Sequence, residues 1–339
     1  MMIENEGLYK KASVAVDNWL ELHKDETFDL DTICRQLEIH DSNKRNLITI
    51  KLSYEVNRGK SLEKDGKHYR YIDKNPKYIN WISADMEGTL NIQWPFGRED
   101  NSRFVFDGSV LICPGDIIVI AGVSNTGKTT FCQNLLWENM DLFPCTLMGN
   151  EYTPIKFKRR VSRMDWKNPL NENGTPKFEL IERRDNWKDI INPNNINIVD
   201  WIDTPDDNFY SIRKIIEGIQ SKLRNGIAVL SIQKGEDKAL GTGGQFSEHL
   251  SSLYLTINSG ILYVRKCKEW YEHNPNFKTN RFDIVNSGTK FHNIRKVKKC
   301  TKCYGFSVTK HTKCDRCNTT GYEEIEPKSV EHTEEDLPI

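Results

Sequence analysis

The segment IIVIAGVSNTGKTTF, residues 117–131, constrains the fold more than any other part of this sequence. Its β-branched, apolar start predicts a buried strand, and the Gly-x-x-x-x-Gly-Lys-Thr pattern after it predicts a loop that leads into a helix. The glycines allow the loop backbone to wrap around an anion, and the N-terminus of the helix adds partial positive charge. The pattern predicts a nucleoside triphosphate site formed by Gly122, Val123, Ser124, Asn125, Thr126, Gly127, Lys128, Thr129 and Thr130.

Two side chains of this loop have specific expected roles. Lys128 is expected to reach the β and γ phosphates of ATP, and the Thr129 hydroxyl is expected to ligate Mg²⁺. The alternative is a glycine-rich turn without a ligand. GTP is not excluded, because the sequence shows no motif that reads the base.

Composition limits the classes of protein to consider. The 339 residues have room for two or three domains, and 48 basic side chains balance 48 acidic ones, so any affinity for nucleic acid must come from local patches. No stretch approaches the ~18 apolar residues of a membrane span, and the first residues lack the pattern of a signal peptide. We therefore expect a cytoplasmic protein without a membrane partner.

Residues 1–78 are predicted to form a small domain of three helices followed by a hairpin. Asp29 or Asp31 is expected to cap the second helix, Ser42 the third, and Asp65 begins the Asp-Gly turn of the hairpin. This order resembles a winged helix-turn-helix, which implies that the third helix enters a duplex DNA groove while the hairpin rests on phosphates. The expected DNA-binding residues are Lys44, Arg45 and Lys51 on the helix, and Lys60, Lys64, Lys67 and Arg70 on the hairpin. The alternative is a solvated charged face on a domain that contacts proteins.

Residues 79–289 alternate strand and helix patterns, which predicts an α/β fold with a mostly parallel sheet and ligands at the carboxyl ends of its strands. Residues 91–97 are predicted to form an edge strand. Glu151, Asp200 and Gln233 each end a predicted strand, so they are expected to converge on the nucleotide. Glu151 would activate the attacking water and Asp200 would hold Mg²⁺ through water. The alternatives are a helix N-cap for Glu151 and Asp203 in place of Asp200, and the basic run 156–160 is expected to be a solvated helix face.

The loop, Glu, Asp and Gln in this order resemble the RecA-like ATPases, and especially the catalytic domain of DnaB-type replicative helicases. The similarity covers roughly residues 114–291 and is carried by PGDIIVIAGVSNTGKTTF, NEYTPIKFKRR and VLSIQK. It implies that Gln233 senses the γ-phosphate and that Lys234 and Lys238 behind it contact single-stranded DNA; a flexible surface loop is the alternative. It also implies that Lys266 and Lys268 reach a neighbouring subunit's nucleotide in a homo-oligomeric ring or filament. The family has Lys-x-Arg at that position and a different N-terminal domain.

Residues 290–325 contain two Cys-x-x-Cys pairs that are ten residues apart. This spacing is typical of a zinc ribbon, and four thiolates favour tetrahedral Zn²⁺. The expected ligands are Cys300, Cys303, Cys314 and Cys317. The surrounding basic residues indicate a second DNA contact or, alternatively, a protein-docking surface. Residues 326–339 are acidic and are expected to form a disordered tail.

Together, these patterns predict a DNA-dependent ATPase that acts on single-stranded or forked DNA in replication or recombination, as a helicase-like motor. An ATP-gated DNA-binding loader or regulator and a strand-exchange recombinase are the alternatives.

Overall fold

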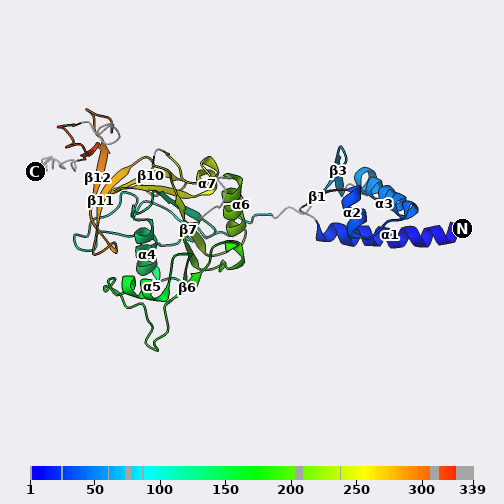
Figure 1. Ribbon diagram of the computed structural model, residues 1–339, viewed down its shortest axis with the longest axis horizontal. Helices are drawn as coiled ribbons and strands as arrows, with labels where there is room; N and C mark the ends of the chain where they lie inside the picture. The colour runs from blue at the N-terminus through cyan, green and yellow to red at the C-terminus, as the bar shows by residue number, and fades with distance from the viewer. Residues whose placement is uncertain are drawn as a thin grey trace, which may run out of the picture. The chain divides into compact units, whose positions relative to one another are not determined.

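The computed structural model describes residues 2–23, 26–59, 61–72, 78–85, 88–202, 209–236, 238–305 and 313–325 (Figure 1). The chain divides into two compact units, Met1–Ala84 and Asp85–Ile339. Each unit has its own apolar core.

The first unit combines three helices with a small antiparallel sheet. The helices are α1 (Met2–Leu22), α2 (Leu30–Gln36) and α3 (Ser42–Tyr54), and α3 continues into a π-helical turn, η1 (Glu55–Gly59). The strands β1 (Thr27–Asp29), β2 (Leu62–Asp65) and β3 (His68–Tyr71) pair in the order β1-β3-β2. Asp29 caps α2 by accepting a 2.9 Å hydrogen bond from the Thr32 amide. The cap of α3 is Asp41 instead of the predicted Ser42, because the Asp41 carboxylate reaches the Lys44 amide.

The second unit contains a ten-stranded mixed sheet with the order β13-β12-β11-β10-β9-β4-β8-β7-β5-β6. Strands β4 to β9 are mutually parallel, whereas β10 to β13 pair antiparallel with their neighbours. The strands are β4 (Ile117–Gly122), β5 (Cys145–Gly149), β6 (Phe178–Glu182), β7 (Ile196–Ile202), β8 (Ile227–Gln233), β9 (Leu253–Asn258), β10 (Ile261–Cys267), β11 (Thr279–Val285), β12 (Lys290–Lys299) and β13 (Tyr322–Glu324).

Helices cover both faces of the parallel strands (Figure 1). On one face, α4 (Lys128–Asn139) contributes Phe131, Leu135 and Leu136 to a cluster that also contains Val229 of β8. On the other face, α6 (Phe209–Gln220) packs its isoleucines in a second cluster. Three short elements complete the unit: α5 (Pro154–Val161), η2 (Trp187–Asp189) and α7 (Gln245–Leu250). The result is an α/β fold whose central parallel strands, such as β4 and β8, are buried on both faces.

Two features of the second unit differ from the sequence prediction. The edge strand predicted over residues 91–97 is wrong: Phe96 and Gly97 make only isolated bridges, although Ile92 and Trp94 are buried. The segment contains Pro95, which has no amide to donate to a ladder. The boundary predicted between the segments 79–289 and 290–325 falls between β11 and β12, which are two strands of one hairpin. Among the described helices, none combines the length and the apolar character that a membrane span requires.

Candidate nucleotide site and metal centre

A cavity of about 470 Å³ lies where the carboxyl ends of β4, β5, β7 and β8 meet. Because parallel strands end at one edge of the sheet, Glu151 after β5, Asp200 in β7 and Gln233 in β8 line the same space. The remaining lining residues are Ser124, Asn125, Gly127, Lys128, Thr129, Thr130, Arg160, Trp201, Ile284 and Gly288.

The loop between β4 and α4 is held in shape by its own backbone and by the sheet. Gly127 has a φ of 108°, and a Cβ there would lie 2.5 Å from Ile284 Cδ1, so both conformation and space require glycine. Thr126 does not line the cavity; its hydroxyl donates to the Val123 carbonyl at 2.8 Å and lies 3.3 Å from the Ile257 carbonyl. The shape of the loop is therefore fixed before any ligand arrives.

Lys128 is the buried cation of the cavity. Its Nζ donates to the carbonyls of Gly122 at 2.9 Å and Val123 at 2.8 Å, and it lies 3.5 Å from Gln233 Oε1. Burial lowers the pKa of Lys128. Gln233 also donates to Ser124 Oγ at 3.2 Å, so it connects the loop with the end of β8.

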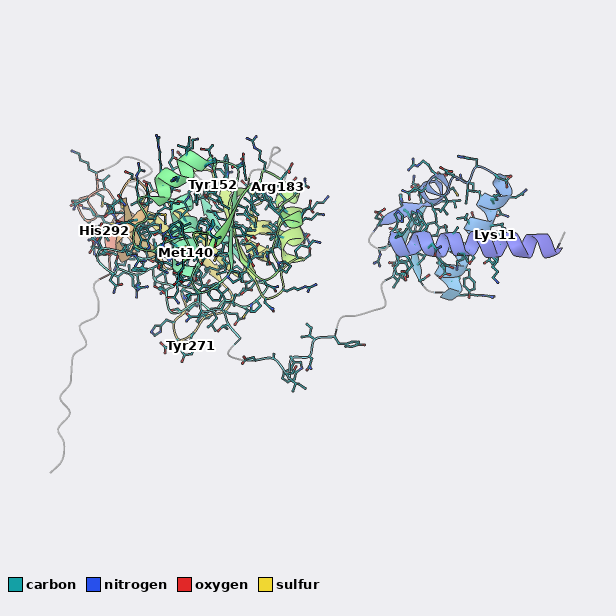
Figure 2. The ribbon with its side chains drawn as sticks, turned by 90° about the horizontal axis from the view of Figure 1, so that it is seen from below. Lys11, Met140, Tyr152, Arg183, Tyr271 and His292 are labelled. Atoms are coloured by element: carbon teal, nitrogen blue, oxygen red, sulfur yellow. The ribbon has the colours of Figure 1, made fainter. Side chains whose placement is uncertain are left out.

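The Asp200 carboxylate accepts hydrogen bonds from hydroxyl groups of two other segments. Thr129 Oγ1 donates to Asp200 Oδ1 at 3.3 Å, and the phenol of Tyr152 (labelled in Figure 2) donates to Oδ2 at 2.5 Å. Burial raises the pKa of Asp200 and also that of Tyr152. Carboxylate and hydroxyl oxygens are hard donors of the kind that Mg²⁺ accepts. The alternative residue, Asp203, lies outside the described residues.

Arg160 corrects one sequence prediction. It was expected on a solvated helix face, and its neighbours Lys156, Lys158 and Arg159 are indeed exposed. The Arg160 guanidinium instead turns inward, where it donates to the Gln133 side chain, to Thr130 Oγ1 at 3.1 Å and to the Gly288 carbonyl at 2.6 Å. It thereby ties the start of α4 to the turn before β12.

Glu151 is exposed at the mouth of the cavity. Its alternative role as an N-cap of α5 is excluded, because Thr153 caps that helix through the Lys156 amide. Sequence reasoning did not identify Trp201, which lines the cavity with a φ of 78° at an irregularity in β7. Its indole nitrogen is buried without a hydrogen-bond partner among the described groups.

Lys266 and Lys268 differ in their accessibility. Lys266 Nζ donates to the Glu248 carbonyl at 2.5 Å and to the His249 carbonyl at 3.0 Å, so it binds the C-terminal end of α7. Burial and the charge of Lys268 lower the pKa of Lys266. Lys268 is exposed, which leaves it as the accessible member of this pair.

Several of the expected DNA-binding cations are engaged within the protein. Lys51 is buried, with Nζ 2.9 Å from Asp17 Oδ1 and 2.6 Å from Glu55 Oε1, so this residue is not presented to a phosphate backbone. The other engaged groups are Arg45 with Asp31, Arg70 with Glu63 and, at 3.9 Å, Lys67 with Asp29. Lys44 and Lys64 are exposed, whereas Lys60 lies outside the described residues.

The loop after β8 is braced from within by Lys234. This residue is buried, and its Nζ donates to the carbonyls of Gly235 at 3.1 Å and Lys238 at 2.7 Å. Lys238 itself is exposed.

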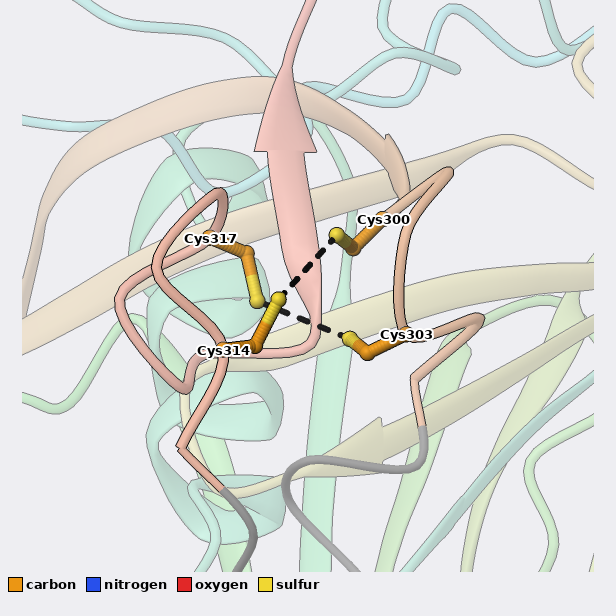
Figure 3. A group of neighbouring side chains, drawn as sticks. All are labelled: Cys300, Cys303, Cys314 and Cys317. Carbon is orange, nitrogen blue, oxygen red and sulfur yellow. Dashed lines mark hydrogen bonds between the residues drawn. The ribbon is translucent and has the colours of Figure 1, made fainter.

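Four cysteines form a candidate metal centre at the end of β12. Their side chains point toward one another from the end of β12 and from the turn before β13 (Figure 3). The Sγ atoms of Cys300 and Cys314 are 3.8 Å apart and those of Cys303 and Cys317 are 3.6 Å apart, and all four lie within 4.8 Å of one another. A tetrahedral Zn²⁺ with Zn–S bonds of about 2.3 Å requires sulfur separations of about 3.8 Å. The cluster can therefore hold a metal such as zinc. His311 lies outside the described residues, and His292 faces Glu99 and Asp100 instead of the cysteines.

Comparison of the chain with known protein families and with characterised proteins finds no match. The geometry of these two sites is therefore the basis for assigning a function.

Proposed function

We propose that the chain is an ATP hydrolase of the RecA-like class whose turnover is stimulated by single-stranded or forked DNA. The observation that carries this proposal is the convergence of Lys128, Thr129, Glu151, Asp200 and Gln233 on one cavity. These side chains come from four separate segments, and each is of the type that phosphoryl transfer requires at its position.

Each side chain has a distinct role in the proposed reaction. Lys128 would exchange its two carbonyl partners for phosphate oxygens, a favourable exchange for an ammonium group that is already desolvated. Thr129 and Asp200 fit Mg²⁺, which when bound would neutralise charge on the phosphates. Glu151 would orient and deprotonate the attacking water. Gln233, within reach of both Ser124 and Lys128, would respond to the γ-phosphate.

The parts outside the cavity support DNA as the partner. Three helices followed by a hairpin are consistent with a winged helix, and four clustered thiols are consistent with a zinc ribbon. Both kinds of domain are used to bind nucleic acid. We propose a homo-oligomer in which Lys268 reaches the neighbouring nucleotide.

One observation favours a second candidate function, an ATP-gated DNA-binding switch. The proposed motor needs a cation from the neighbouring subunit, but Lys266 is held by carbonyls at the end of α7. A single lysine lacks the planar fork of arginine and stabilises the transition state less well. Slow hydrolysis would suit a switch better than a motor.

The test is ATP hydrolysis measured with and without single-stranded DNA, at two salt concentrations. A motor predicts stimulation that fades as salt rises, because phosphate contacts are salt-dependent. A switch predicts slow hydrolysis that is indifferent to DNA, together with DNA affinity that changes between ATP and ADP. Absence of hydrolysis and of ATP binding would contradict both.

A further inference from the structure

A second cavity, of about 610 Å³, lies on the antiparallel half of the sheet. It is bounded by β9 to β13 and by the loop after β8. Of the sixteen described residues that line it, none is acidic and six are cationic: Lys234, Lys238, Arg265, Lys278, Lys298 and Lys299. Since the whole chain has equal numbers of basic and acidic residues, this groove concentrates positive charge.

The described residues leave most of this positive charge unpaired. Lys238, Lys278, Lys298 and Lys299 are exposed, and none of them forms an ion pair with a described residue. Arg265 pairs with Glu248 at 2.9 Å, and Lys234 braces the loop. The two acids of the nearby strand β13 are engaged elsewhere: Glu323 binds Arg316 at 2.6 Å, and Glu324 binds Arg295. Among the described residues, these four lysines therefore have no acidic partner and can meet an anionic ligand.

The groove also presents aromatic rings. Tyr263, Phe277 and Tyr322 line it, and Phe277 is 66% exposed. Phe277 has a φ of 64°, a left-handed conformation that is rare and strained for a bulky residue. An exposed phenylalanine gains little from burial in return. Strain of this kind, next to a ligand-sized groove, indicates that the ring is kept in place for binding.

We propose that this groove binds single-stranded nucleic acid, with phosphates on Lys238, Lys278, Lys298 and Lys299 and a base stacked on Phe277. Cations that follow the backbone and aromatic rings that stack on bases are the combination by which proteins hold single strands. A duplex keeps its bases stacked inside and offers the rings no face. The coupling of this groove to hydrolysis rests on the proposed function, whereas strand binding itself does not.

The experiment is fluorescence anisotropy of the full chain with a labelled 20-nucleotide thymidine strand, without nucleotide, over a series of salt concentrations. The variant Lys278→Ala/Lys298→Ala removes two phosphate contacts, so the slope of log affinity against log salt should fall by about 1.4. The matched control is Lys214→Ala/Lys222→Ala, which removes two exposed lysines on and just after α6. This control should leave affinity and slope unchanged. An equal loss in both double variants would overturn the proposal, because it would mean diffuse attraction to the net charge.

A second pair of variants tests stacking. Phe277→Asn removes the ring at a position where asparagine tolerates a left-handed backbone, and it should weaken binding about tenfold while thermal stability stays equal or rises. Phe277→Tyr should retain the affinity. If Phe277→Asn binds as well as the native protein and inorganic polyphosphate competes fully, the groove binds any polyanion without recognising bases. That result would overturn the proposal.

The same binding measurement with a uridine strand and with a DNA duplex defines the ligand. Binding of the thymidine strand, a uridine strand or both supports the inference, and their ratio identifies the sugar. Preference for the duplex contradicts it. If no strand binds even at low salt, the groove does not bind nucleic acid, and the proposed ATP hydrolysis is unaffected by that result. Conversely, a chain that binds strands but does not hydrolyse ATP refutes the proposed function and leaves the groove standing.

Discussion

The hydroxyl of Thr129 donates a hydrogen bond of 3.3 Å to Asp200, although 71 residues separate the two positions. Thr129 lies in the first turn of α4, and Asp200 lies in β7, two strands from β4. The parallel order β4-β8-β7 brings both to the same edge of the sheet. A hydroxyl and a buried carboxylate thus form a pair of hard oxygen donors beside the glycine loop.

Asp200→Asn is predicted to have opposite effects on stability and on activity. Hydrolysis should fall at least about a hundredfold, because the amide is a poor Mg²⁺ ligand. Without Mg²⁺ and nucleotide, however, the variant should equal or exceed the stability of the native protein. Burial raises the folded-state pKa of Asp200, so the fold favours the protonated form, and this contribution to stability is lost as pH rises through the raised value.

The thermal unfolding midpoints of both proteins, measured in a chelator from about pH 4 upward, show whether their stability difference changes with pH in the predicted direction. The variant should gain stability relative to the native protein as pH increases. A stability difference that does not change with pH would contradict the buried carboxylate as its cause.

Lys128→Ala should reduce ATP hydrolysis at least about a hundredfold while the chain stays folded. Among the described residues, the buried ammonium group has no anionic partner in contact, so its removal does not leave an unpaired opposite charge there. Hydrolysis and circular dichroism measured together check both parts. The control is Lys156→Ala, which changes an exposed lysine on α5 outside the cavity. Hydrolysis at the native rate in Lys128→Ala would show that the cavity is not the site of ATP hydrolysis.

Lys51→Met should destabilise the first unit by about 3 kcal/mol, because it removes the cation that lies 2.6 Å from the buried Glu55 carboxylate. Amide hydrogen exchange of peptides from residues 2–72 in the full chain measures this local change. The double variant Lys51→Met/Glu55→Leu should recover most of the loss, since it removes both charges. If DNA affinity falls in Lys51→Met while the amides keep their protection from exchange, Lys51 contacts DNA and its structural role is contradicted.

Cys303→Ser/Cys317→Ser should abolish metal binding. We expect one zinc per native chain after gel filtration and none in the variant, with faster amide exchange in β13 and at the end of β12. Cys113→Ser, at an exposed cysteine far from the cluster in sequence, is the control and should keep its zinc. Equal zinc content in all three proteins would exclude the four-thiolate site.

The sequence allowed the prediction of features whose chemistry is local. The glycine loop and the two Cys-x-x-Cys pairs are short motifs, and the strand ends at Glu151, Asp200 and Gln233 follow from alternating strand and helix patterns. The α/β class and the clustering of the four cysteines are confirmed. The catalytic and DNA-binding roles stay predictions.

Side-chain direction could not be predicted, because it depends on contacts between distant segments. Arg160 lies in a run of four cations within five residues, and it alone turns inward because Gln133, Thr130 and Gly288 offer it hydrogen-bond acceptors. Lys51 is likewise distinguished from Lys44 by the acids of α1 and η1 around it. The groove on the antiparallel strands combines residues that are up to 91 positions apart in sequence, from Lys234 to Ile325, so no single motif indicates it.

The change from parallel to antiparallel pairing at β9 also has a kinetic consequence. Strands β9 and β10 are joined by two residues and β11 and β12 by four, so each pair closes a short loop. Strands β4 and β8, by contrast, become neighbours only after more than a hundred residues of intervening chain have been ordered. Because short loops close at a lower entropic cost, the hairpins are expected to pair early and to offer β9 as the edge on which the parallel strands assemble.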